Sequence, residues 1–276
     1  MGKNKAERLR FTRSKGQRVE ADFGGGEVGS DGGLLLLREV DRRLGLTRRA
    51  AAVLADDRQA VTMLRQRVYA LCAGRENLND ADTLRHDTLH QIAAGGEGVL
   101  ASASTLCRFE NDQTRASAWA INALLVERFV AAYARPPATI TLDFDATDAT
   151  DTPVHGRQEG RFVHGYYDHH CFLPLYVFCG DHLLVAYLRR SNADAARHAA
   201  VILRLLVRRI RQVWPRTKIV LRADSGFCRD LLLTWCDQHD VKYVVGLARD
   251  ARLLAHAADL RQEARTRFEQ TGKKQR

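Results

Sequence analysis

The sequence lacks the features that mark membrane and secreted proteins. No apolar run approaches the roughly 20 residues that a membrane-spanning helix needs, and no apolar segment follows the basic N-terminus. The six cysteines form no Cys-x-x-Cys pair and lie in apolar or helical contexts, which indicates free thiols in a reducing compartment. These absences predict a cytoplasmic protein without a membrane partner.

Acidic residues are also in the minority. The chain has 43 Lys and Arg against 33 Asp and Glu, a net charge of +10, and most of the cationic residues are Arg. The guanidinium group matches phosphate geometry well, so a polyanionic partner is the first expectation, although an Arg-rich protein can also simply carry solvated charges. With 45% hydrophobic residues over 276 positions, the chain can form one large domain or two ordinary ones.

Pro136-Pro137 divides the sequence into two halves of different pattern. Residues 1–135 begin with a basic arm, followed by a strand-like stretch at 18–23 and a predicted hairpin turn at 24–29. Apolar residues at helical spacing then predict helices, one of them capped by Ser30. The predicted helices cover residues 34–44, 58–72 and 115–133.

A loose helix-turn-helix signature lies within this half. Gly95, Gly96 and Gly98 separate a short helix from the segment 104–111, which opens with Ser and Thr. Ser104, Thr105 and Arg108 are the candidate DNA-binding residues, although most helix pairs with such a turn bind nothing. We expect electrostatic DNA affinity that resides mostly in residues 1–135 and falls steeply with salt.

Residues 136–276 alternate between strands and helices. Strands are predicted at 139–148, 161–179, 183–189, 218–223 and 241–246. Helices are predicted at 193–213, capped by Ser191 and Asp194, at about 226–238, and from about 250 to the end. This order predicts an α/β domain in which a mixed sheet carries helices on its faces.

The first of these strands carries the chemistry. Its aliphatic and aromatic residues alternate with polar ones, so Asp143 and Asp145 share one face with Thr141. Two acids on a face that should be buried require a metal ion, a cationic partner or a raised pKa.

Asp224 ends the strand 218–223, and we expect this strand to lie beside the first one. Asp145 and Asp224 would then meet at one edge of the sheet. Carboxylates without surrounding Cys or His are typical ligands of Mg²⁺ or Mn²⁺. Two such ions can activate water and stabilise the leaving oxygen in phosphodiester chemistry.

Three motifs resemble the DDE transposases of bacterial insertion sequences: Leu142-Asp-Phe-Asp-Ala-Thr-Asp148, His164-Gly-Tyr-Tyr and Arg222-Ala-Asp-Ser-Gly-Phe227. Asn79-Asp80, Leu84-Arg85 and the segment 104–111 resemble the helical N-terminal region of the same group. The resemblance covers nearly the whole chain, and the motif at 222–227 is its most specific part. It implies a mainly α-helical N-terminal domain followed by a ribonuclease-H-like catalytic domain at 136–276.

The resemblance also implies a function. The protein would be a homo-oligomer on double-stranded DNA that binds terminal inverted repeats and target DNA. It would carry out metal-dependent strand cleavage and transfer. The family's first acid falls on Asp145, with Thr147 two residues later, and its second falls on Asp224. Both would be catalytic metal ligands, and Asp143 would be a supporting acid.

The family's third acid has no clear match. Arg265 and Glu269 have the right mutual spacing, but Gln262 and Arg276 stand where a Tyr and a Lys are usual, and the segment follows Asp224 too closely. Glu269 is therefore predicted to be an exposed helical residue, and the chain to be C-terminally truncated and catalytically inactive or nearly so. A non-catalytic DNA-binding fragment that inhibits intact transposase is the alternative.

Two further alternatives concern residues of the second half of the chain. Asp143-Phe-Asp145-Ala-Thr147 also matches the Asp-x-Asp-x-Thr of haloacid-dehalogenase-like phosphatases, with Asp143 as nucleophile. That family needs a later acidic pair, and after Asp181 the second position holds Val185. A zinc site is the other alternative, but its residues fit no standard spacing. They are His169, His170, Cys171, Cys179 and His182.

Overall fold

The computed structural model describes residues 9–14, 17–21, 30–55, 59–96, 98–147, 161–165, 168–248 and 250–273. The chain forms two compact units, Met1–Leu124 and Leu125–Arg276. Helix α7 (Arg115–Ala131) spans the division between them, ahead of the proline pair at which the sequence pattern changes.

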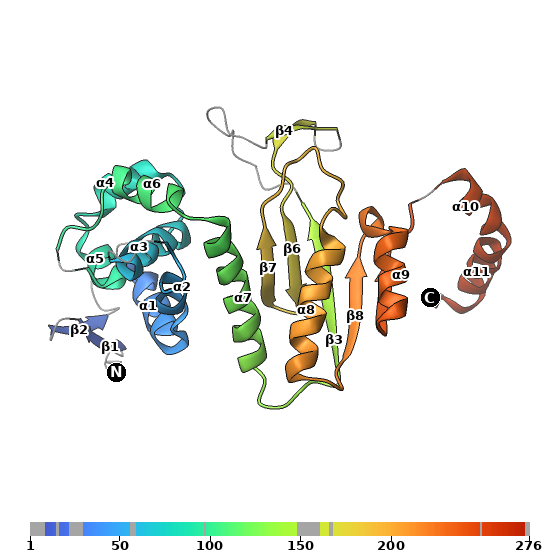
Figure 1. The fold of residues 1–276 in the computed structure, drawn as a ribbon, viewed down its shortest axis with the longest axis horizontal. Helices are drawn as coiled ribbons and strands as arrows, with labels where there is room; N and C mark the ends of the chain where they lie inside the picture. Colours follow the sequence, from blue (N-terminus) through green and yellow to red (C-terminus); the bar gives the residue numbers. More distant parts are fainter. Residues whose placement is uncertain are drawn as a thin grey trace, which may run out of the picture. The chain divides into compact units, whose positions relative to one another are not determined.

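The first unit contains a hairpin and a set of short helices (Figure 1). Strand β1 (Leu9–Ser14) pairs antiparallel with β2 (Gln17–Ala21). The predicted turn at 24–29 and most of the basic arm lie outside the described residues. The other elements are η1 (Ser30–Gly32), α1 (Gly33–Leu44), α2 (Leu46–Ala51), α3 (Ala60–Cys72), η2 (Leu78–Asp80), α4 (Ala81–Leu84), α5 (Thr88–Ala94) and α6 (Ala103–Asn111).

A buried acid lies at the centre of the helices in this unit. Asp41 is only 8% exposed, and its carboxylate accepts hydrogen bonds from the Thr47 amide at 2.8 Å and the Thr47 hydroxyl at 2.5 Å. Arg65 Nε donates to it at 3.1 Å and the Tyr69 hydroxyl at 3.3 Å. Asp41 belongs to α1, Thr47 to α2, and Arg65 and Tyr69 to α3, so this carboxylate links the three helices.

The second unit is built on a five-stranded mixed sheet in the order β7-β6-β3-β8-β9 (Figure 1). Strand β3 is parallel to β8, and β8 to β9, whereas β6 is antiparallel to both β3 and β7. The predicted neighbourhood of the first strand and the strand 218–223 is therefore confirmed. The bounds are β3 (Thr139–Ala146), β6 (Leu175–Cys179), β7 (His182–Tyr187), β8 (Lys218–Ala223) and β9 (Val241–Val245).

One face of this sheet forms the core of the unit. Buried side chains of the strands pack with helices α8 (Ala199–Val213) and α9 (Asp230–Gln238) and with the last turns of α7. The opposite face is open at Phe178, Arg222 and Val244, all of which are exposed. The prediction of helices on the faces of the sheet thus holds for one face of the part that the structure describes.

Two local predictions in this unit are wrong. The stretch 161–179 is not one strand but β4 (Phe162–His164), β5 (His169–Cys171) and β6, of which the first two form a separate two-stranded sheet. Helix α8 starts at Ala199, after His198 in a left-handed conformation, and has no side-chain cap. Ser191 instead bonds to the backbone of Phe162, and Asp194 accepts from the Ala196 amide.

The described C-terminal part is helical, as predicted, with α10 (Ala251–His256) followed by α11 (Ala258–Thr271), and neither helix has a buried residue. No helix among the described residues is both long and apolar enough to cross a membrane. All six cysteines lie in the described part of the chain and remain thiols.

Candidate active site at the carboxyl edge of the sheet

Asp145 and Asp224 lie at the carboxyl ends of two neighbouring parallel strands. The last paired residues of β3 and β8 are Phe144 and Ala223. Asp145 is the next residue of β3, and Asp224 directly follows the end of β8. Both acids are exposed. Because β3 and β8 are parallel, both acids lie at the same edge of the sheet, the one at which the two strands end.

Asp143, two residues earlier on the same face, is engaged within the protein. It stands opposite Arg222 in the strand pairing. Arg222 Nε donates to one carboxylate oxygen of Asp143, and Nη2 donates to the other at 2.7 Å. These hydrogen bonds raise the pKa of Arg222. Asp143 is therefore offset by a cationic side chain, on a face that is partly open rather than buried as the sequence suggested.

The turn after β8 fixes the backbone of Asp224. The Asp224 carboxylate accepts a hydrogen bond from the Gly226 amide at 2.8 Å and caps the short helix η3 (Ser225–Phe227). Phe227 is fully buried and packs edge-on against Phe144, the residue before Asp145. The core under one acid is thus continuous with the core under the other.

Close backbone packing surrounds the same turn. A Cβ added at Gly246, directly after β9, would lie 2.9 Å from the Ser225 amide nitrogen. A Cβ at Gly226 would lie 3.0 Å from Asp224 Oδ1 and 3.1 Å from Ala195 Cβ. Only glycine leaves the backbone room to approach this closely at Gly246.

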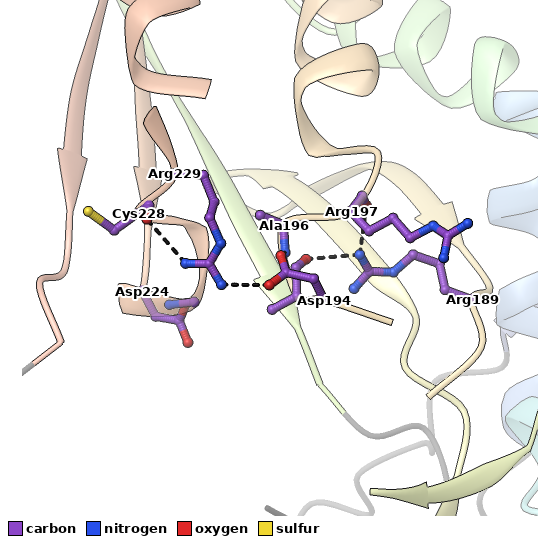
Figure 2. A network of polar contacts seen from close by, with 9 residues as sticks. Arg189, Asp194, Ala196, Arg197, Asp224, Cys228 and Arg229 are labelled. Carbon is purple, nitrogen blue, oxygen red and sulfur yellow. Dashed lines mark hydrogen bonds and ion pairs between the residues drawn. The ribbon is translucent and has the colours of Figure 1, made fainter. Parts of the chain in front are cut away.

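A network of polar contacts borders the turn (Figure 2). Arg229 Nη2 donates to Asp194 Oδ2 at 2.6 Å, and Arg229 Nη1 donates to the Cys228 carbonyl at 3.1 Å. Burial would raise the pKa of Asp194, but the bonds from Arg229 and from the Ala196 amide outweigh it and lower the pKa. Further along, Arg189 donates to backbone carbonyls of the loop that contains Asp194.

The two edge acids have donor chemistry that suits a hard divalent cation. Mg²⁺ is commonly held by one or two carboxylates together with water and phosphate oxygens of the substrate. Within the described residues, no group of three or more His, Cys, Asp or Glu side chains could hold a metal ion. This finding also gives no support to the zinc alternative. Two carboxylates alone would leave most of the coordination positions of such an ion to water and to phosphate oxygens of a substrate.

The comparison with known families decides the classification. The family model for the transposase DDE domain, group 1, matches residues 11–276. The chain belongs to this family. No curated protein matches the sequence.

The structure describes most of the residues on which the resemblance to the transposase family depends. Asp145 and Asp224 lie at one edge of the sheet. Thr147 follows directly after β3 and is half-buried. Glu269 is an exposed residue of α11, as predicted. The end of the first motif, Asp148, and both tyrosines of the second lie outside the described residues.

The candidate DNA-binding residues of this transposase chain lie on α6. Ser104 and Arg108 are exposed, whereas Thr105 is half-buried and its amide donates to the capping hydroxyl of Ser102 at 3.4 Å. Residues 95–102 connect α5 to α6, which is longer than the turn of about 3–4 residues in a helix-turn-helix. The predicted motif is therefore present only as two successive helices.

The sequence-based reading missed the partner of Asp143, although a signal existed. Asp143 and Asp145 have the same spacing as Arg222 and Asp224, so the register that brings the two acids together also pairs Asp143 with Arg222. It also missed the contact between Asp194 and Arg229, for which no local pattern gives a signal because 35 positions separate the two residues.

Proposed function

We propose that the chain is a DNA transposase of an insertion sequence, which binds terminal inverted repeats and carries out metal-dependent strand cleavage and transfer. The observation that supports this most directly is the register of β3 and β8, which brings Asp145 and Asp224 to one edge of the sheet in a member of the DDE transposase family. We further propose that the protein acts in the cytoplasm as a homo-oligomer on double-stranded DNA.

In this proposal, Asp145 and Asp224 hold Mg²⁺ or Mn²⁺, which when bound would polarise a phosphodiester and activate water. Asp143 is a supporting acid that acts through Arg222 rather than as a ligand, because both of its oxygens accept from the guanidinium. The Arg222 side chain is 63% exposed beside the acids and retains donors for a DNA phosphate.

DNA binding is assigned mainly to residues 1–135, through the basic arm and through Ser104, Thr105 and Arg108 on α6. The exposed side chains of Ser104 and Arg108 support this assignment. Contacts to phosphates would supply most of the affinity, which should therefore fall steeply with increasing salt.

We expect strand cleavage by this chain to be absent or weak. Two-metal chemistry requires both ions in fixed positions, and no third acid joins Asp145 and Asp224 in the part of the chain that the structure describes. Weak cleavage that is lost in Asp145→Asn would favour the transposase, whereas binding of an inverted-repeat duplex with no cleavage in Mg²⁺ or Mn²⁺ would favour the alternative, a DNA-binding protein that occupies element ends.

The test combines metal titration with DNA binding. Mn²⁺ affinity is measured by paramagnetic resonance for the native protein and for Asp145→Asn, Asp224→Asn and Asp181→Asn. Asp181 is the matched control, since it is an exposed acid in the turn between β6 and β7, at the opposite end of the antiparallel strand β6. The first two substitutions should weaken Mn²⁺ binding at least tenfold, and the control should not.

The same proteins are then tested by gel shift on a duplex with the element's terminal repeats and on a scrambled duplex, followed by a cleavage assay in Mg²⁺ and Mn²⁺. We expect preference for the repeat duplex in all four proteins. Equal Mn²⁺ affinity in all four, together with equal binding of both duplexes, would show that the proposed function is wrong.

A further inference from the structure

We propose that the ion pair of Asp194 and Arg229 positions Asp224, by fastening the turn after β8 to the loop between β7 and α8. The two residues would be positioning residues and not ligands. Arg229 bonds to the backbone of the segment after Asp224, and Asp194 bonds to Arg229. The inference rests on the proposed role of Asp224 as a metal ligand.

Arg229 is attached to the turn through its own backbone and side chain. Its amide donates to the Phe227 carbonyl at 2.8 Å, and its Nη1 donates to the Cys228 carbonyl at 3.1 Å. The Phe227 amide in turn donates to the Asp224 carbonyl at 3.3 Å. Two successive backbone hydrogen bonds therefore link Arg229 to Asp224.

Asp194 belongs to a loop that several hydrogen bonds hold in place. Its Oδ1 accepts from the Ala196 amide at 2.8 Å, which orients the carboxylate towards Arg229. Arg189 is only 5% exposed, and its Nη1 donates to the carbonyls of Ala195 and Arg197 at 2.9 and 2.8 Å. Its Nε donates to the Leu173 carbonyl at 2.9 Å, so a buried cation anchors the loop to the segment before β6.

The loop and the turn also touch directly. The position of a Cβ on Gly226 would be 3.1 Å from Ala195 Cβ, so the Gly226 backbone lies against the loop. Gly226 donates the hydrogen bond that orients the Asp224 carboxylate. The loop therefore packs against the residue whose amide donates to Asp224. Figure 2 shows Arg229 between Asp224 and Asp194, with Arg189 beyond them.

A general stabilising role explains this pair less well. The side chains of Arg229 and Asp194 are 47% and 50% exposed, and pairs with such exposure contribute little to global stability. The fully buried Phe227 holds the turn to the core in any case. The expected effect is therefore on the orientation of Asp224 and not on folding.

The experiment compares Arg229→Gln and Asp194→Asn with a control, Arg209→Gln. Arg209 forms a similar ion pair with Glu127 in the same unit, with side chains 37% and 47% exposed, and neither residue belongs to the turn or the loop. Three quantities are measured on the full chain: Mn²⁺ affinity, Tm, and hydrogen exchange of the Gly226 amide in metal-free protein.

Arg229→Gln and Asp194→Asn should each weaken Mn²⁺ binding about tenfold, the effect typical of losing a residue that orients a ligand. They should accelerate exchange at Gly226 and leave Tm within the range of the control. A loss of affinity together with faster exchange at Gly226 and without a fall in Tm separates a positioning role from a merely structural one.

Several results would overturn the inference. Unchanged Mn²⁺ affinity in Arg229→Gln and Asp194→Asn, while Asp224→Asn loses binding, would refute the positioning role and leave the proposed function intact. A loss of affinity that follows a fall in Tm would make the role structural. Unchanged affinity in Asp224→Asn as well would refute instead the role of Asp224 as a metal ligand, on which this inference rests.

Discussion

Acidic residues of the two units differ in their burial and in the number of hydrogen bonds that they accept. Asp41 in the first unit is buried and accepts from Thr47, Arg65 and Tyr69, so the chain's own donors occupy both of its oxygens. Asp145 and Asp224 in the second unit are exposed, and the bond that orients Asp224 comes from a single backbone amide. A satisfied carboxylate holds helices together, whereas an exposed one at a strand end retains oxygens for an external cation.

Replacing the buried acid should have the largest effect on folding. Asp41→Ala removes the anionic partner of Arg65 and the acceptor of the Thr47 and Tyr69 hydroxyls, and breaking such a buried pair costs about 3–5 kcal/mol. Asp145→Ala should change the free energy of unfolding by less than about 0.5 kcal/mol. Urea titration followed by circular dichroism measures both. Similar losses for the two variants would remove the distinction between the acids.

The pH dependence of stability should sharpen the same contrast. Burial alone would raise the pKa of Asp41, but hydrogen bonds from Thr47 and the charge and hydrogen bond of Arg65 outweigh it, so the pKa lies below its ordinary value of 3.8. A lowered folded-state pKa gives stability that is complete above the unfolded value and is lost as pH falls through the folded one.

The stability difference between the native protein and Asp41→Asn should therefore be constant from pH 7 to about pH 5 and shrink below about pH 4. Urea midpoints at pH 7, 5 and 3 test this. A difference that grows as the pH is lowered would show that Asp41 is not stabilised in its charged form.

The position of Asp224 depends on the close packing of its turn against Gly246, so Gly246→Ala should lower both stability and Mn²⁺ affinity. The new Cβ would lie 2.9 Å from the Ser225 amide nitrogen, so backbone must move, at a cost of about 1–3 kcal/mol. Mn²⁺ affinity should fall with it. The control is Gly33→Ala at the start of α1, where nothing lies within 4 Å of the added Cβ. Equal thermal stability of the two variants would contradict this account.

Much of the sheet could be predicted because its signals are local. Alternating apolar residues identify β3, and the strand 218–223 has the predicted bounds. The pairing of β3 with β8 also followed from the order of elements. The strands themselves depend on the period of the side chains, which is a local property, whereas the pairing of β3 with β8 depends on the order of the elements along the chain.

The start of α8 could not be predicted in the same way. Ser191 and Asp194 are good helix-capping residues, yet tertiary contacts use them elsewhere: Ser191 bonds to Phe162, and Asp194 pairs with Arg229. The buried Arg189 then holds the residues between them in a loop through the Ala195 and Arg197 carbonyls. A local capping preference of about 1 kcal/mol is too small to resist such contacts.

The smallest expected effect concerns Asp143, which lies between the two kinds of acid. Its carboxylate is paired, like that of Asp41. It is only half-buried, however, and its partner Arg222 is largely exposed. A double-mutant cycle with Asp143→Asn and Arg222→Gln should therefore give a coupling of only about 0.2–1 kcal/mol in the free energy of unfolding, the range for exposed ion pairs.

The cycle also separates a supporting acid from a ligand. Because both oxygens of Asp143 accept from Arg222, Asp143→Asn should leave Mn²⁺ affinity within about threefold of the native value, whereas Asp145→Asn should weaken it at least tenfold. A tenfold loss in Asp143→Asn that persists in the Arg222→Gln background would identify Asp143 as a direct ligand. The ion pair would then be a contact that the metal displaces, and Asp143 would join Asp145 and Asp224 as the third carboxylate at the edge of the sheet.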